Sequence, residues 1–221
     1  EGRLDAKAVD EMSDRLERCR ALAVGPGLGR GDQAVALVRR ALAVPLPLVI
    51  DGDGLWALGE SLREDRDLLR DRRPPTILTP HTGEFSYLGG DTSTDRLTAV
   101  TSLAQRLGAI VHLKGRRALT ASPDATVWVN VTGNPGMATG GTGDVLTGIV
   151  GSLLAQGAPA PDAMWAGAFL HGLAGDVAAS RVGRKALAAR DLPEALPIAM
   201  REVRRWVPPH GAIRTVLDAS A

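Results

Sequence analysis

Residues 132–148 read T-G-N-P-G-M-A-T-G-G-T-G-D-V-L-T-G and carry most of the information on fold and function. Five glycines precede one carboxylate, Asp144, and apolar residues then recur at helical spacing from Val145 until Gly157 ends the run. A glycine-rich loop that leads into a helix leaves several backbone N–H groups free to bind an anion. Glycine also lets the backbone approach a phosphate closely, because no Cβ stands in the way.

The carboxylate of Asp144 needs a separate explanation, because it would repel a phosphate bound at the same helix start. It is better explained as the group that handles the acceptor of a phosphoryl transfer. A structural loop has no need of so many glycines beside one carboxylate, so we favour a functional interpretation. The helix dipole is expected to keep Asp144 ionised.

The composition is that of a globular α/β protein. The chain has 221 residues, of which 44% are hydrophobic and 23% charged, and its formal net charge is +1. This balance gives no reason to expect nucleic acid or a membrane as a partner, and no apolar run reaches the roughly 18 residues of a membrane span. The single cysteine, Cys19, excludes an internal disulfide. We expect a cytoplasmic location, and the start at Glu1 suggests that an upstream segment was removed or omitted.

Strands alternate with helices along the chain. The predicted strands are residues 21–24, 46–50, 76–78 and 109–113, followed by a hairpin of 118–121 and 126–131. The predicted helices are residues 5–19, the segment that Asp32 caps, and 94–107, 144–156, 162–180 and 191–205. This order favours a mostly parallel sheet covered on both faces. Polar and glycine-rich segments follow the strands, where open α/β sheets bind ligands, so we expect one site built from several loops.

The first two strand ends carry a glycine-rich loop and two aspartates. G-P-G-L-G-R-G at residues 25–31 is either a tight turn or a binding loop. Asp51 and Asp53 are both candidate helix caps, and Asp53 is the better placed of the two. The role of Asp51 is not readable from its spacing.

The histidines differ in their surroundings. His81 lies in the turn T-P-H-T-G-E, where we favour ligand contact, and Glu84 either caps the next helix or helps to order a solvated metal ion. His112 is expected to pack inside a strand, whereas His171 is either structural or functional. His210, in the segment after residue 207, is given no role.

Lys114-Gly115 follows the fourth strand and is a candidate for phosphate binding through its charge and backbone N–H groups. The alternative is a solvated lysine at a strand end. Arg116 and Arg117 add positive charge there, or are surface residues.

Five segments together resemble the ADP-dependent NAD(P)H-hydrate dehydratase family of the ribokinase-like superfamily. They are A-V-G-P-G-L-G (23–29), V-I-D-G-D-G-L (49–55), L-T-P-H-T-G-E-F (78–85), H-L-K-G (112–115) and N-V-T-G-N-P-G-M-A-T-G-G-T-G-D-V-L-T-G (130–148). The resemblance implies a three-layer α/β/α fold and one domain over residues 1–221 that lacks the family's first strand and glycine-rich segment. The chain departs from the family at Trp56, Thr82 and Arg116, and Arg116 could alter contacts near the nucleotide.

The resemblance also implies an activity, the conversion of the (6S)-hydrate of NADH or NADPH back to the reduced cofactor with ADP cleaved to AMP and phosphate. Asp144 would be the catalytic residue, and the anion hole would be formed by Gly140, Gly141, Thr142 and Gly143. The ADP or AMP contacts would be Lys114, Gly115, Arg116, Arg117, Ala118 and Gly143. The hydrated dinucleotide would contact Gly29, His81, Asn134 and Asp144.

Mg²⁺ would be held mainly by the phosphates, so no protein metal ligand is predicted. The family further implies a homo-oligomer and an NAD(P)H-hydrate epimerase as a fused or separate partner. Two alternatives stay open at this point. One is an ATP-dependent kinase of a small vitamin-precursor alcohol, and the other is an inactive nucleotide-binding fragment.

Overall fold

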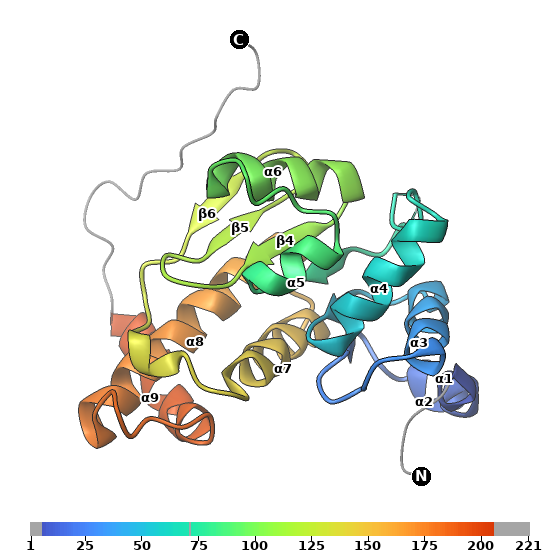
Figure 1. The fold of residues 1–221 in the computed structure, drawn as a ribbon. Helices are drawn as coiled ribbons and strands as arrows, with labels where there is room; N and C mark the ends of the chain where they lie inside the picture. The colour runs from blue at the N-terminus through green and yellow to red at the C-terminus, as the bar shows by residue number, and fades with distance from the viewer. Residues whose placement is uncertain (1–5, 71, 206–221) are drawn as a thin grey trace.

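The chain folds around one six-stranded sheet, which a computed structural model describes together with its helices for residues 6–70 and 72–205 (Figure 1). The sheet order follows the chain, from β1 to β6. β1 to β4 are parallel, while β4, β5 and β6 form an antiparallel meander. The strand bounds are β1 Leu22–Val24, β2 Leu48–Ile50, β3 Thr76–Leu78, β4 Ile110–Leu113, β5 Leu119–Ala121 and β6 Val127–Val129.

Helices cover both faces of the sheet. Their bounds are α1 Ala6–Glu11, α2 Ser13–Leu16, α3 Asp32–Ala43, α4 Asp53–Glu64, α5 Thr82–Tyr87, α6 Arg96–Leu107, α7 Thr142–Ala155, α8 Ala160–Val182 and α9 Asp191–Arg205, with a 3₁₀ turn η1 at Pro135–Met137. α3, α4 and α6 pack on one face, α7 and α8 on the other, and α9 lies against α8 (Figure 1). The predicted three-layer, mostly parallel α/β fold is confirmed.

The alternation of side chains along β2 builds both halves of the core. Leu48 and Ile50 join the cluster that contains α3 and α4, whereas Val49 joins the cluster that contains α7 and α8. All three side chains are fully buried. A strand with apolar residues on both faces is typical of a sheet covered by helices on both sides.

Three local predictions need correction. The single helix expected over residues 5–19 is two short helices with a turn at Met12, and α1 has no buried residue whose packing could stabilise a longer helix. Asp32 and Asp53 are not caps. They are the first residues of α3 and α4, and Gly31 and Gly52 occupy the cap positions without a side-chain bond.

The remaining predicted elements are found with ends shifted by up to two residues. Across residues 6–70 and 72–205, no helix is long and apolar enough to cross a membrane. His210 and the segment after residue 207 lie outside the described residues.

Candidate active site

The start of α7 is open to an incoming anion. In the part of the chain that the structure describes, the backbone N–H groups of residues 140–144 have no acceptor. Gly141 holds φ at +87°, a left-handed conformation that glycine adopts without strain. The Thr142 hydroxyl fixes the preceding loop, because it lies 2.9 Å from the Met137 carbonyl oxygen and 3.0 Å from that of Thr139. The geometry therefore has the features of an anion hole.

Asp144 is the third residue of α7, and its side chain is exposed. It shares the first helical turn with the free N–H groups, so a group bound there would lie within one turn of the carboxylate. The structure thus places Asp144 beside the predicted anion hole and leaves its carboxylate accessible.

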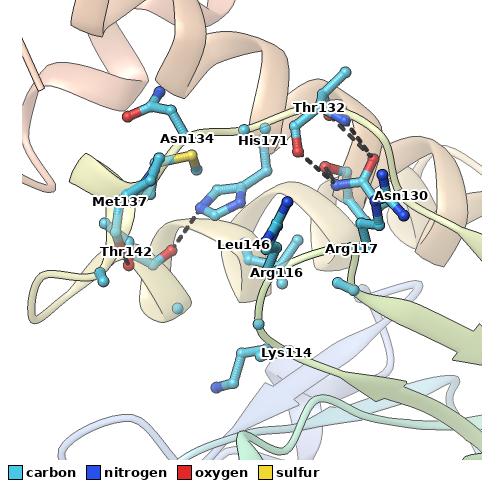
Figure 2. A pocket seen from close by; sticks show the side chains of 18 of the residues that line it. Lys114, Arg116, Arg117, Asn130, Thr132, Asn134, Met137, Thr142, Leu146 and His171 are labelled. Atoms are coloured by element: carbon cyan, nitrogen blue, oxygen red, sulfur yellow. Dashed lines mark hydrogen bonds between the residues drawn. The ribbon is translucent and has the colours of Figure 1, made fainter. Parts of the chain in front are cut away.

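A cavity of about 890 Å³ opens next to this helix start. Figure 2 shows the loop after β4, with Lys114, Arg116 and Arg117, facing Thr142 of α7 and His171 of α8. The predicted site residues that line the cavity are His81, Lys114, Gly115, Arg116, Arg117, Ala118, Asn134, Thr142 and Gly143. The predicted site residues outside its lining are Gly29, Gly140, Gly141 and Asp144. The cavity therefore gathers the predicted nucleotide contacts together with His81 and Asn134, whereas Asp144 and Gly29 are not among its lining residues.

Lys114 is the centre of a buried charge cluster. Its ammonium nitrogen lies 2.7 Å from Asp51 Oδ1 and 3.5 Å from Glu84 Oε2. Asp51 is 2% exposed and also accepts a hydrogen bond from the Thr147 hydroxyl of α7, at 2.9 Å. A Cβ added to Gly143 would lie 3.3 Å from both the Asp51 carboxylate and the Lys114 ammonium. The sequence spacing did not reveal a role for Asp51. In the structure its carboxylate lies against the first turns of α7, next to the predicted anion hole.

Lys114 is therefore not a solvated lysine at a strand end, which was the alternative interpretation of the sequence. Its backbone N–H donates to the Pro80 carbonyl at 2.8 Å, so that group is already engaged. Its ammonium holds two carboxylates next to the helix start. Any attraction that Lys114 exerts on a phosphate is reduced by these carboxylates.

His81 and Glu84 form a reciprocal cap at the start of α5. His81 Nδ1 accepts a hydrogen bond from the Glu84 backbone N–H, and the Glu84 carboxylate accepts one from the His81 backbone N–H at 2.7 Å. The capping role predicted for Glu84 is therefore present. The His81 imidazole remains at the edge of the cavity, with 60% of its side chain exposed.

The loop between β6 and α7 is fastened to α8. Asn130 Nδ2 donates to the Ala168 carbonyl oxygen at 3.2 Å. The Thr132 hydroxyl donates to the Phe169 carbonyl oxygen at 2.8 Å. Asp176 accepts from the Gly133 backbone N–H at 2.8 Å and from an amide of the same loop. These bonds hold the glycine-rich loop in place before it enters α7.

Asp176 was missed by the sequence analysis, and Asn134 gains a second explanation from it. The Asn134 amide nitrogen lies 2.9 Å from Asp176 Oδ1, and its Oδ1 accepts from the Gly136 N–H. The only available signal was an isolated aspartate on an alanine-rich helix, 43 residues after Gly133 in sequence.

His112 is buried and His171 is half-buried, and both have lowered pKa values. The pKa of His171 is lowered to about 4, chiefly by burial; the bond to Thr142 opposes this shift and the charge of Lys114 adds to it. His171 Nε2 lies 2.8 Å from the Thr142 carbonyl oxygen, so Nε2 carries the proton and helps to fix the start of α7 (Figure 2). Burial also lowers the pKa of His112 to about 3, and its Nδ1 contacts Thr120, as expected for a packed strand residue.

The 25–31 loop follows β1 at the same edge of the sheet. The Gly29 backbone N–H donates to Asp53 Oδ2 at 2.9 Å, and Arg30 pairs with the other carboxylate oxygen at 3.3 Å. Asp53, which the sequence had suggested as a helix cap, therefore anchors this loop.

The sheet order and the anion hole at the start of α7 define a ribokinase-like protein. A solved ribokinase-like superfamily protein from Enterococcus faecalis superposes with a TM-score of 0.74 at 28% identity, covering 89% of this chain and 68% of that one. The family model for NAD(P)H-hydrate dehydratase matches residues 3–198. The chain belongs to the NAD(P)H-hydrate dehydratase family, as the five sequence segments had indicated.

Individual relatives agree with this assignment. The ADP-dependent (S)-NAD(P)H-hydrate dehydratase of Neisseria meningitidis is 45% identical over 181 residues, which are 79% of this chain and 60% of that protein. The bifunctional NAD(P)H-hydrate repair enzyme of Moorella thermoacetica is 43% identical over 211 residues, or 93% of this chain and 39% of that protein. The solved ADP/ATP-dependent NAD(P)H-hydrate dehydratase of Bacillus subtilis has a TM-score of 0.72 at 30% identity and covers 83% of this chain and 66% of that one. The chain thus spans between about 40% and 60% of the length of these two curated relatives.

Proposed function

We propose that this chain catalyses the ADP-dependent dehydration of the (6S)-hydrate of NADH or NADPH. The observation that carries the proposal is the set of acceptor-free N–H groups at residues 140–144, which share one helical turn with the exposed carboxylate of Asp144. A phosphoryl group and the hydroxyl that accepts it can then be held within reach of each other. Membership of the NAD(P)H-hydrate dehydratase family supports the choice of substrate.

The reaction balances without any redox partner. Hydroxide leaves C6 of the hydrated ring poorly, so the hydroxyl oxygen first takes the β-phosphoryl group of ADP, and AMP departs. The C6–O bond then breaks, with the ring nitrogen supplying electrons and phosphate carrying away the oxygen. Loss of a proton from the neighbouring ring carbon restores NADH or NADPH. The net change is hydrate plus ADP giving reduced cofactor, AMP and phosphate.

In this proposal Asp144 orients the C6 hydroxyl and receives its proton. An ionised carboxylate is a weak base, but a loose phosphoryl-transfer transition state depends chiefly on positioning and charge stabilisation. The N–H groups of Gly140, Gly141, Thr142 and Gly143 would stabilise the negative charge on the transferred phosphoryl. Gly29, His81 and Asn134 are proposed to contact the hydrated dinucleotide.

The AMP part of ADP is proposed to occupy the 890 Å³ cavity, against residues 114–118 and Gly143. Magnesium bound with ADP would neutralise phosphate charge. Among the described residues no three histidine, cysteine, aspartate or glutamate side chains converge on one point, so phosphate oxygens and water are proposed as its ligands. The nearest buried carboxylates, Asp51 and Glu84, already pair with Lys114.

The test is the variant Asp144→Asn, assayed for ADP-dependent recovery of NADH from its hydrate. Turnover should fall by about 10² or more, which is the usual contribution of a positioned acid or base, while thermal protection by ADP should persist. Asp162→Asn is the matched control, because Asp162 also lies in the first turn of a long helix, α8. Near wild-type turnover in Asp144→Asn would exclude the role given to this carboxylate.

The kinase and fragment alternatives make different predictions in the same assay. A kinase would use ATP and accumulate a stable phosphorylated alcohol, whereas the proposed reaction releases free phosphate and AMP from ADP. An inactive fragment would bind ADP without turnover. A cytoplasmic homo-oligomer that works with an NAD(P)H-hydrate epimerase, fused or separate, completes the proposal, and the bifunctional repair enzyme of Moorella thermoacetica supports the link to a second activity.

A further inference from the structure

A second cavity, of about 840 Å³, lies away from the site described above, between the end of α4, the end of α5 and the last turn of α6. We define it as the arginine groove. The arginines that line it are Arg63, Arg66, Arg70 and Arg106, against one acidic residue in the lining, Asp67. Its lining shares no residue with the 890 Å³ cavity.

Two of the four arginines are neutralised by neighbours. Arg63 pairs with Glu60 at 2.8 Å, and Arg70 pairs with Asp67 at 3.4 Å, each with a residue three positions earlier in the chain. Arg66 has no hydrogen bond or ion pair with any residue in the described ranges, and Arg106 has no carboxylate partner there. The groove therefore contains two positive charges that no described carboxylate balances.

Arg106 is held in a fixed orientation. Its Nη2 donates to the Leu88 carbonyl at 2.8 Å and to the Gly89 carbonyl at 3.0 Å. Gly89 has φ at +73°, and a Cβ there would lie 3.1 Å from this nitrogen, so glycine gives the guanidinium room. Burial, and after it the charge of Arg66, hold the pKa of Arg106 below its usual range. Bringing like charges together is unfavourable unless an anion joins them.

Part of the remaining lining is apolar, beside the polar residues Ser86 and Asp67. Leu62 and Leu88 line it and are 7% and 2% exposed, and the half-buried ring of Tyr87 lies beside them. Two guanidinium groups without a carboxylate partner in one groove suit phosphate oxygens, because each offers paired N–H donors in a planar fork. An apolar floor suits the flat body of a small molecule better than it suits a bare ion.

We infer that the arginine groove binds a small ligand that carries two or more phosphate groups, with Arg66 and Arg106 as its phosphate contacts. The site is separate from the proposed active site and does not depend on the proposed activity. The groove and the edge of the proposed active site are, however, joined by one short helix, α5. α5 begins at the His81 cap and ends at the groove, and the Arg30 guanidinium of the 25–31 loop lies 5.4 Å from the Tyr87 ring centre.

Tyr87 provides a local reporter, because it is the one tyrosine among the 221 residues. Isotopic labelling of tyrosine rings would therefore give a single NMR signal from the groove. Titration with inorganic tripolyphosphate should shift that signal with saturation, and sodium chloride of matched ionic strength should not. ATP should bind more tightly than tripolyphosphate if the apolar floor contributes.

Arg66→Glu is the decisive variant, because Arg66 is exposed and follows the end of α4, so its replacement leaves the core intact. Tripolyphosphate affinity at the Tyr87 signal should fall by about tenfold or more, which is the usual effect of losing a charge-assisted phosphate contact. Arg201→Glu makes the same charge change on the exposed face of α9 and should leave the titration unchanged. Absence of a saturable shift in the wild-type protein, or equal effects of the two variants, would overturn the inference.

Discussion

Replacement of Lys114 by methionine tests whether the charge cluster supports the start of α7. Methionine keeps the length and apolar character of the lysine stem but removes the ammonium that lies 2.7 Å from Asp51 and 3.5 Å from Glu84. Asp51 would keep only the hydroxyl of Thr147 as a side-chain donor. A carboxylate that is 2% exposed would then lack a counter-charge.

The expected cost follows from the burial of the pair. Removing one partner of a buried ion pair costs about 3–5 kcal/mol. The Lys114 side chain is 21% exposed, so water can partly replace it, and we reduce the expected loss to about 2–4 kcal/mol. For a domain of this size such a loss corresponds to a fall in Tm of roughly 5–15 °C.

Urea denaturation of four proteins would measure the effect: wild type, Lys114→Met, Asp51→Asn and the double variant. The double variant should recover about 1–3 kcal/mol relative to the sum of the single changes, because neither partner then leaves a buried charge behind. Strict additivity, or a loss below about 1 kcal/mol in Lys114→Met, would refute this account of the cluster.

Three further predictions concern α8 and its contacts. Gly172→Ala should lower the free energy of unfolding by about 1–3 kcal/mol, because its Cβ would lie 2.2 Å from the Thr132 hydroxyl. Gly148→Ala in α7 is the control, because its Cβ meets no atom within 4 Å, and it should raise the free energy of unfolding by up to about 1 kcal/mol in the same urea assay. The pKa of His171 is lowered to about 4 from an ordinary 6.5, so its contribution to stability is complete above pH 6.5 and is lost as the pH falls towards 4. His171→Gln should therefore flatten the dependence of the unfolding free energy on pH between pH 4 and pH 6.5. Asp176→Ala should cost about 1–3 kcal/mol, since two donors lose their acceptor, and should weaken ADP binding in calorimetry, where an unchanged affinity would contradict its role in holding the loop.

The layers of the fold could be predicted because local sequence decides them. The strand Leu48–Ile50 is apolar throughout, and a strand of that kind is buried on both faces. Capping was harder to predict. Asp53 has the right residue type for a cap, but its carboxylate instead accepts from Gly29, 24 residues earlier, a contact that sequence spacing does not encode.

The same reasoning explains what was missed in the site. Gly143 and Asp144 could be predicted as site residues because loop, glycine and carboxylate are contiguous in sequence. Asp51 and Asp176 act through partners 63 and 43 residues away, which are brought close only when strands and helices assemble. Residues that hold a site in place from distant elements leave no local sequence pattern, even where the loop they hold has a clear motif.

The charge cluster also changes how the site must attract a nucleotide. The Lys114 ammonium already faces two carboxylates, so its net effect on a phosphate is small at short range. We therefore propose that the attraction comes from the acceptor-free N–H groups at the start of α7 and from Arg116 and Arg117, which line the same cavity and form no ion pair with the described residues. Arg116, which the sequence resemblance marked as a departure from the family, adds positive charge to the lining of this cavity. We accordingly propose that phosphate is bound in this chain mainly by backbone N–H groups and arginines, while Lys114 holds Asp51 and Glu84 in place.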